Sequence, residues 1–535
     1  MFLCLLQLRI YYKVKNKFIN ASYNKLFGWL AYREIRNKIL ITVLLLFVFR
    51  FLATIPVPGI DPGALKNAFS GVSGIFNSLD IFSGGTLSRF SIISIGLGAY
   101  INSTLIFQLL GLVFKRLENL QKEGGAGRAK INQWTRFLTV PLAALQSLGI
   151  YNLLKSDNLI QSNISTLQLI SIVSVATAGA MVLLWIGELM TEQGLGNGIS
   201  LIIMVGIIAR VPGGLISLFS QSTFVGPRDW LIFAVAVCTG IAILLIAILL
   251  YRISRFITKR YFIRSIYLLL ISSIFLMSLY AVFAKEFIKS KLSYDWLNNT
   301  YTFIDHILTK PTILPAVIII ALSAVIIMII AFNEGTRNIP IQFSRRYKVT
   351  KTLLFNKSHL PYRLLIAGVV PIIFASSFLY LPAIMYFFFS KSSINWLKDF
   401  VTNTNTFLDQ TNWQYWATYF ILVFVLTYFW TLNIAFRPKN IAESFRKQGN
   451  YINGVRPGEE TEIYLLKLVS KLTLLGGLFL GFISILPFFV RGVPGLGSIL
   501  AGGTSCLIVV AVILDLKRQV AALRASQNYS KYIEN

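Results

Sequence analysis

Twelve stretches of this 535-residue chain are apolar enough and long enough to cross a bilayer. A hydrocarbon core about 30 Å thick requires roughly 20 apolar residues per helix. Only 13% of the residues are charged, whereas roughly a quarter are charged in an average soluble domain. We therefore predict an all-α polytopic membrane protein. The expected spans are 39–57, 90–114, 137–154, 167–189, 198–218, 229–251, 266–284, 312–332, 364–388, 414–434, 465–489 and 495–514.

The distribution of Lys and Arg predicts the topology. A net charge of +29 in a soluble chain would suggest nucleic-acid binding. Here the basic residues lie before the first span, after the last, and in connections 115–136, 252–264, 333–363 and 436–464. Two or four spans separate successive basic connections, so all of them share one side. The positive-inside rule places that side and both termini in the cytoplasm, or in an equivalent such as a plastid stroma.

The sequence lacks the residue patterns that disulfide frameworks, metal sites and nucleotide-binding sites require. Of the three cysteines, Cys238 and Cys506 lie inside expected spans, and His306 and His359 lie on opposite sides. A disulfide framework or a metal site is therefore not expected. No cofactor is expected, and no Walker-type phosphate-binding run is present.

Two other function classes fit the sequence less well. An ion-coupled transporter needs a carboxylate or His near the bilayer centre, whereas Glu188 and Asp515 lie at span ends. A lipid-linked transferase needs a cluster of catalytic groups at one membrane face, and Glu188 and Glu192 have no third partner in the sequence pattern. The residues alone indicate a polytopic membrane protein, with a channel as one reading.

Four features depart from a plain series of spans. Residues 73–85 are rich in Gly and Ser and cannot span, so they form either a re-entrant segment or an amphipathic surface turn. The Gly-rich run 187–200 predicts a tight turn, with Asn197 or Ser200 as a helix cap. The connections 333–362 and 436–464 are long enough for a docking partner. Polar residues inside spans serve either interhelical hydrogen bonds or a seam that opens; they are Asn102, Ser103, Thr104, Gln108, Gln146 and Ser147.

Seven sequence runs, in order and at span boundaries, resemble the SecY family of protein-conducting channels. They are 49–61 (FRFLATIPVPGID), 82–89 (FSGGTLSR), 122–128 (KEGGAGR), 187–200 (GELMTEQGLGNGIS), 368–377 (GVVPIIFASS), 456–459 (RPGE) and 502–505 (GGTS). The resemblance extends from about residue 35 to residue 527. It implies a non-enzymatic pore subunit of the Sec translocase, which passes unfolded secretory proteins and releases membrane segments sideways.

The resemblance also implies an architecture of ten helices in two inverted halves. An apolar ring would close the pore by excluding water; its expected members are Leu97, Ile101, Ile203, Ile207, Ile373 and Ile508. A plug would fill the outer funnel, with Ser73, Gly74, Ile75, Phe76, Asn77, Phe82, Ser83, Gly84 and Gly85.

A lateral gate and a docking surface are implied in the same way. The gate would contain Asn102, Gln108, Gln146, Ser147 and Leu365; the family usually carries an Asn where this chain has Leu365. The docking surface would contain Arg337, Arg345, Arg346, Lys348, Arg456, Pro457, Gly458 and Glu459. Expected partners are SecE- and SecG-type small subunits, the SecA motor or the ribosome, signal sequences, unfolded polypeptides and the lipid bilayer, with SecDF- or YidC-type accessories as further candidates.

The expected number of spans exceeds the family's ten by two. The surplus spans, 229–251 and 266–284, would form a hairpin at the hinge between the halves. The expected division is 1–38 (cytoplasmic segment), 39–220 (first half), 221–311 (hairpin), 312–514 (second half) and 515–535 (cytoplasmic tail). The expected location is a bacterial inner membrane, with a plastid thylakoid as the alternative.

Overall fold

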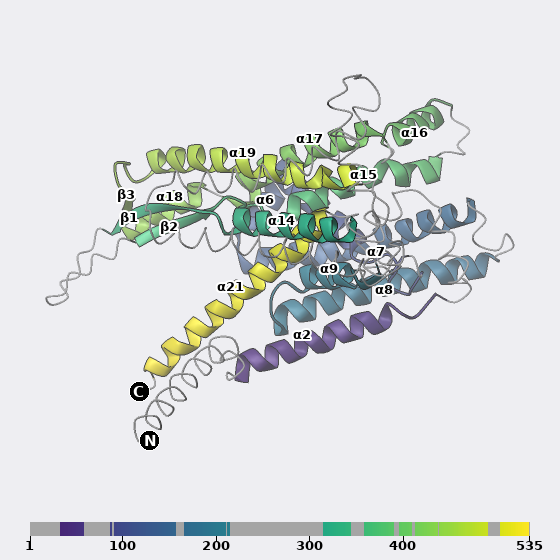
Figure 1. The fold of residues 1–535 in the computed structure, drawn as a ribbon, viewed down its shortest axis with the longest axis horizontal. Helices are drawn as coiled ribbons and strands as arrows, with labels where there is room; N and C mark the ends of the chain where they lie inside the picture. Colours follow the sequence, from purple (N-terminus) through teal and green to yellow (C-terminus); the bar gives the residue numbers. More distant parts are fainter. Residues whose placement is uncertain are drawn as a thin grey trace, which may run out of the picture. The chain divides into compact units, whose positions relative to one another are not determined.

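The computed structural model describes a mostly helical chain (Figure 1). The described residues are 33–57, 86–87, 90–156, 165–209, 211–213, 314–343, 358–389, 395–408, 412–436, 438–490 and 503–533. The chain divides into two compact units. Unit 1 consists of Met1–Val72, Phe82–Ile207 and Val512–Asn535, and unit 2 of Ser73–Ile81 and Ile208–Ala511. The last helix, α21 (Gly503–Ile533), contributes residues to both.

Unit 1 is built on helices that pack through small side chains. Its helices are α2 (Arg33–Leu52), α5 (Gly98–Val113), α6 (Lys115–Lys122), α7 (Gly125–Ser156), α8 (Thr166–Gln193) and nearly all of α9 (Gly198–Ile208). Helix α7 packs against both α5 and α8, and α2 packs against α8. Ala99, Ala143, Ala176 and Ala180 form the buried contact of α5, α7 and α8. Alanines allow the helix backbones to approach closely, as is usual between helices in lipid.

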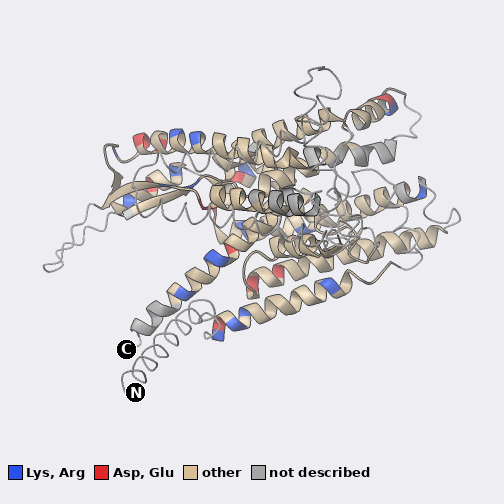
Figure 2. Cartoon of the chain, in the orientation of Figure 1, with Lys and Arg blue, Asp and Glu red and all other residues tan. Residues whose placement is uncertain are grey.

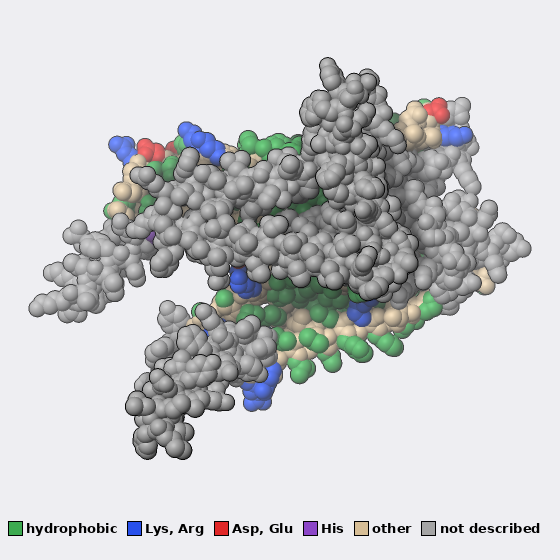
Figure 3. Space-filling view, viewed as in Figure 1, with side chains coloured by type: hydrophobic (Ala, Val, Ile, Leu, Met, Phe, Trp, Pro, Cys, Tyr) green, Lys and Arg blue, Asp and Glu red, His purple; other side chains and the backbone are tan. Residues whose placement is uncertain are grey.

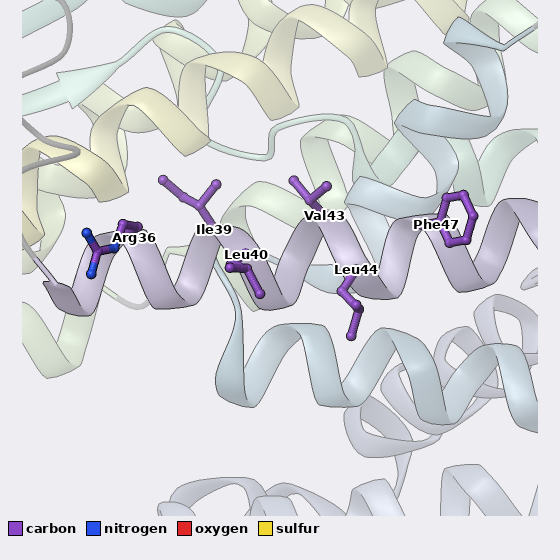
Figure 4. Close-up of a pocket in the computed structure, with 6 residues that line it drawn as sticks. All are labelled: Arg36, Ile39, Leu40, Val43, Leu44 and Phe47. Carbon is purple, nitrogen blue, oxygen red and sulfur yellow. The ribbon is translucent and has the colours of Figure 1, made fainter.

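Helix α2 presents an apolar face to its surroundings. Its charged residues lie only near its two ends (Figure 2), and its outer side carries a row of hydrophobic side chains (Figure 3). A groove of about 550 Å³ lies along this face, and the described residues that line it belong to α2 (Figure 4). They are Arg36, Ile39, Leu40, Val43, Leu44 and Phe47. An exposed apolar helix face of this kind is typical of a surface that meets lipid or another helix.

Unit 2 contains a second group of long helices. They are α14 (Leu314–Glu334), α15 (Val370–Phe389), α16 (Asn395–Phe407), α17 (Trp413–Trp430), α18 (Pro438–Gln448) and α19 (Glu459–Val490). A π-helical turn, η2 (Thr431–Ala435), directly follows α17. Helix α17 packs along α19 and α15. Close packing of α17 and α19 depends on Gly481, where an added Cβ would lie 2.7 Å from the Phe420 ring.

A three-stranded antiparallel sheet joins the two long connections of unit 2, so the all-helical expectation is corrected here. The strands are β1 (Thr336–Phe343), β2 (Ser358–Arg363) and β3 (Asn450–Ile452), in the order β2-β1-β3. Ile339 pairs with Leu360, and Ile341 pairs with Ile452. The sheet shares a buried cluster with η2, α18 and the first turns of α19; this cluster includes Ile339, Tyr362, Phe436, Phe445 and Leu465. We call this assembly the sheet module.

The helix bounds differ from the expected spans for local reasons. Three helices of the described part are long and apolar enough to cross a membrane: Thr166–Gln193, Trp413–Gln448 and Glu459–Leu486. Helix α15 begins at Val370 instead of 364, because Gly368 adopts a φ of +63° and interrupts the backbone there. Helices α7 and α21 are longer than the apolar spans and carry polar extensions. The expected hairpin spans, 229–251 and 266–284, lie outside the described residues.

Candidate functional site

The contact between α5 and α7 brings the predicted gate residues of unit 1 onto two neighbouring helices. The Ser103 hydroxyl of α5 donates a 2.7 Å hydrogen bond to the backbone carbonyl of Thr135 in α7. The Thr139 hydroxyl donates to the same carbonyl at 2.7 Å. Nearby, the rings of Phe107 and Trp134 lie 6.3 Å apart. The contacts between the two helices thus include a polar one, from Ser103 to Thr135, and an aromatic one, between Phe107 and Trp134.

Two of the predicted gate residues keep polar atoms without partners. Within the described residues, Gln108 Oε1 and Ser147 Oγ are buried and take part in no hydrogen bond. Gln146 lies beside Gly98, where an added Cβ would lie 3.7 Å from Gln146 Oε1. Asn102 is half-buried on α5. An unpaired buried polar atom costs free energy. A further polar group that paired with these atoms would therefore stabilise the contact between α5 and α7.

The fifth gate residue belongs to unit 2. Leu365 is buried between β2 and α15. An added Cβ on Gly476 of α19 would lie 3.4 Å from Leu365 Cδ2 and 2.7 Å from the Leu364 carbonyl oxygen. The segment that precedes α15 therefore packs tightly on α19 through a glycine.

Five of the six predicted ring residues lie on α5, α9, α15 and α21, and the sixth, Leu97, directly precedes α5. Leu97 precedes α5, and the Ile101 amide donates to its carbonyl at 3.0 Å, so the two lie one turn apart. Ile203 and Ile207 lie one turn apart on α9, and both are buried. These four belong to unit 1. Ile373 on α15 and Ile508 on α21 belong to unit 2, so the ring itself stays a prediction.

Every predicted plug residue lies outside the described part, as do Arg345, Arg346 and Lys348 of the predicted docking surface. After the expected plug, the structure describes Thr86 and Leu87 and then the chain from Phe90 to Ser156. The Val57 amide donates to the Phe90 carbonyl at 2.9 Å. Gly179 of α8 also packs on this segment, because an added Cβ would lie 2.0 Å from the Ile92 carbonyl oxygen. The residues that flank the expected plug are thus held against α8.

The Gly-rich run between α8 and α9 forms the predicted tight turn. Asn197 Oδ1 accepts from the Ser200 amide at 3.2 Å, which confirms Asn197 as a cap of α9. Gly196 has a φ of +87°, a conformation that glycine adopts without steric cost. The Thr42 hydroxyl of α2 accepts from the Leu195 amide at 2.9 Å. This turn therefore connects α2, α8 and α9.

The sheet module presents the described part of the docking surface. Arg337 is exposed on β1, and Arg456, Pro457 and Glu459 are exposed between β3 and the start of α19. The Arg456 amide donates to Glu460 Oε2 at 3.3 Å, and the Arg456 carbonyl accepts from the Thr461 hydroxyl at 2.7 Å. The first turn of α19 thus fixes the Arg456 backbone while the guanidinium faces outward.

The core of the sheet module contains a buried tyrosine. The Tyr362 ring lies edge-on to Phe436, with centroids 5.4 Å apart. Its hydroxyl is buried and has no hydrogen-bond partner among the described residues. Removal from water disfavours the phenolate, which raises the pKa of Tyr362 to about 12.

Comparison with known proteins identifies the family. The SecY family model matches residues 91–280 and 266–517. The chain belongs to the SecY family. It is 30% identical over 506 residues to the protein translocase subunit SecY of Staphylococcus aureus, covering 94% of this chain and 97% of the relative. It is 32% identical over 508 residues to SecY 1 of Lactobacillus kefiranofaciens, with the same coverage.

Solved structures of SecY-type channels share the fold. A protein-conducting channel matches with a TM-score of 0.54 at 16% identity, covering 92% of this chain and 93% of that chain. Sec61 of the canine ribosome–channel complex matches with a TM-score of 0.52 at 15% identity, with the same coverage. This SecY-family chain is thus a multi-pass membrane protein and a protein-conducting channel, which confirms the resemblance, and it is not an enzyme.

Two features of this SecY-family chain do not follow from the sequence pattern. Arg136 Nε of α7 forms a 2.7 Å ion pair with Glu188 Oε1 of α8, although the pattern places Arg136 only in a basic connection. The second feature is the pairing of β1 with β3. The alternating apolar residues Ile339 and Ile341 are the one signal for β1, and no signal in the sequence indicates its partner strand.

Proposed function

We propose that this chain is the central pore subunit of a Sec translocase, with a lateral gate that opens beside α5 and α7. The observation that supports the gate is the pair of buried polar atoms on α5 and α7. Gln108 Oε1 and Ser147 Oγ have no hydrogen-bond partner in the described part of the chain. A polar residue or backbone group of an entering segment would relieve that cost. A signal sequence would then bias the closed–open equilibrium by its own binding energy.

The ring of six apolar residues would close this pore without any specific chemical group. A dry apolar constriction excludes ions because water does not fill it. The same surface accepts passing chains of any sequence, because apolar contact requires no matching hydrogen bonds. The plug residues around 73–85 would cover the ring from the outer side.

The energy for translocation would come from a partner on the sheet module. The exposed Arg337 and Arg456 suit an acidic motor surface or the phosphates of ribosomal RNA. Sec61 in the canine complex is a ribosome-bound relative, which supports the ribosome; the SecA motor is the second candidate. Small SecE- and SecG-type subunits would complete the channel in a bacterial inner membrane. The expected hairpin within 221–311 would pack at the hinge, and deleting 224–310 tests whether export requires it.

The deciding experiment is crosslinking of a stalled secretory chain. Single cysteines replace Ile101, Ile203, Ile373 and Ile508 in a background lacking Cys4, Cys238 and Cys506. Leu44→Cys on the exposed face of α2 is the matched control. We expect crosslinks from all four ring positions and none from Leu44→Cys.

Two outcomes of this experiment would contradict parts of the proposal. Correctly inserted protein without crosslinks at any ring position would show that the substrate path does not follow this ring. Crosslinks from Gln108→Cys and Ser147→Cys to a signal sequence, and not to the mature part of the substrate, would separately support the gate. Their absence, with ring crosslinks present, would remove the gate and leave the pore.

A further inference from the structure

Helix α16 has three distinct faces. Trp396, Phe400 and Phe407 are spaced by four and seven residues and therefore share one face, which also carries the exposed Asn403. Their side chains are 70%, 62% and 49% exposed. Val401 lies on a second face and is buried. The third face is polar and exposed, with Lys398, Thr402 and Thr406.

The position of α16 is fixed by contacts on both sides. It packs against α15. At its other end, Asn412 Nδ2 donates a 2.9 Å hydrogen bond to the Thr406 carbonyl. The next residue, Trp413, begins α17. The exposed aromatic face of α16 is therefore held close to the end of a long apolar helix.

The surroundings of α17 indicate what covers α16. Helix α17 is one of the helices apolar and long enough to cross the bilayer. Trp413, Ile421 and Val425 are separated by eight and four residues along it and are exposed in the chain. In a bilayer this apolar stripe would suit contact with lipid. Trp413 marks the end of the stripe, at the level where tryptophan prefers to lie in a membrane. Helix α16 ends a few residues before that level.

We propose that α16 is an interfacial helix that inserts Trp396, Phe400 and Phe407 into the headgroup boundary of the bilayer. A helix with one aromatic face and one polar face lies in the plane of that boundary. Lys398, on the polar face, would point toward phosphates and water. Because α16 packs on α15, the lipid surface would hold that end of α15 at a fixed depth. The proposal requires that α17 crosses the bilayer, and it does not depend on the gate or on the driving partner.

The test compares two positions on opposite sides of α16 in the complete translocase reconstituted in liposomes. Phe400→Cys and Thr402→Cys are made in the background lacking the three native cysteines and labelled with a polarity-sensitive fluorophore. Quenching is measured with lipids that carry a nitroxide near the headgroup and, separately, with iodide in the water. We expect lipid quenching to be several-fold stronger at Phe400→Cys, and iodide quenching to be several-fold stronger at Thr402→Cys.

Two outcomes would overturn the proposal. Equal iodide quenching at both positions would mean that the aromatic face meets water. A label at Phe400→Cys that neither quencher reaches would mean that a protein surface covers it. The pair Trp396→Cys and Lys398→Cys repeats the comparison one turn away, so that one misfolded variant does not decide the result. No step of this test requires translocation, so its failure is separate from failure of the proposed function.

Discussion

The ring of Phe374 lies edge-on to the indole of Trp430, with centroids 4.9 Å apart and planes at 73°. Phe374 belongs to α15, next to the predicted ring residue Ile373, and Trp430 is the last residue of α17. The π-helical turn η2 begins directly afterwards, and Phe436 at its end contacts Tyr362 of the sheet module. Aromatic contacts therefore lie at both ends of η2, between the sheet module and α15.

The first prediction concerns this aromatic pair. Edge-to-face pairs contribute about 0.5–1.5 kcal/mol beyond the area they bury. We expect Phe374→Leu and Trp430→Leu to be non-additive by that amount in a double-mutant cycle of detergent unfolding. Pairing Phe374→Leu with Tyr428→Leu, a change at an exposed position of α17, should be additive. Additivity in both cycles would show that the rings do not interact.

A second prediction follows from the buried Tyr362 hydroxyl. Its pKa is raised to about 12 because burial disfavours the phenolate, so the folded module keeps a proton that the unfolded chain loses. The free energy of unfolding therefore keeps its full value below pH ~10 and falls between pH ~10 and ~12. Tyr362→Phe should remove that fall, whereas Tyr451→Phe, at an exposed position, should keep it. Thermal unfolding across this pH range provides the measurement, and an unchanged fall in Tyr362→Phe would refute it.

The Thr42 hydroxyl is the basis of a third prediction. Thr42→Val keeps the shape of the side chain but leaves the Leu195 amide without its acceptor. We expect a loss of about 1–3 kcal/mol in the free energy of unfolding, the usual cost of an unpaired buried donor. Thr54→Val removes a hydroxyl that is exposed and donates to the carbonyl of the nearby Phe51, and its effect should be much smaller. Equal effects of the two variants would contradict the assigned role of Thr42.

A fourth prediction concerns the α8–α9 turn. An added Cβ on Gly198 would lie 2.0 Å from the Gly187 carbonyl oxygen, so Gly198→Ala forces α8 and α9 apart. We expect destabilisation of about 1–3 kcal/mol, typical of overpacking. An added Cβ on Gly125 of α7 would have no atom of the described residues within 4 Å, and Gly125→Ala should be neutral or stabilising. Detergent unfolding of the two variants separates crowding from the general effect of replacing a glycine.

The fifth prediction is about Arg456. Its backbone is held by Glu460 and Thr461, and its side chain faces outward. Arg456→Glu should therefore leave the sheet module folded but reduce partner-driven translocation several-fold. The loss should be larger at low salt, where repulsion between the new carboxylate and the negative surface of the partner is least screened. Arg524→Glu, an exposed position near the end of α21, makes the same charge change and should have little effect. A similar loss in both variants would indicate a general charge effect.

The sequence predicts those elements whose signals are local. Helix α8 is expected over 167–189 and is found over Thr166–Gln193, because a long apolar run and the Ser165 capping box define it. The sequence also limits the cap of α9 to Asn197 or Ser200, and the hydrogen bond from the Ser200 amide to Asn197 Oδ1 identifies Asn197.

Features that depend on distant residues are not predictable in this way. Phe343 pairs with Asn450, and no local propensity of a three-residue strand identifies such a partner. The Arg136–Glu188 ion pair joins residues 52 positions apart. Within the gate, the sequence indicates which residues are polar, but their hydrogen-bond state depends on how α5 and α7 pack.

The order of strands in the sheet module has a consequence for biosynthesis. Strands β1 and β2 are translated first, and α15, α16, α17 and α18 must all be made before β3 emerges. Until then, the edge of β1 that later pairs with β3 is left with open backbone donors and acceptors, and such edges invite wrong pairing. A nascent chain that stops before Asn450 would carry this uncovered edge. The sheet module can therefore be complete only after the helices α15, α16, α17 and α18 have been synthesised.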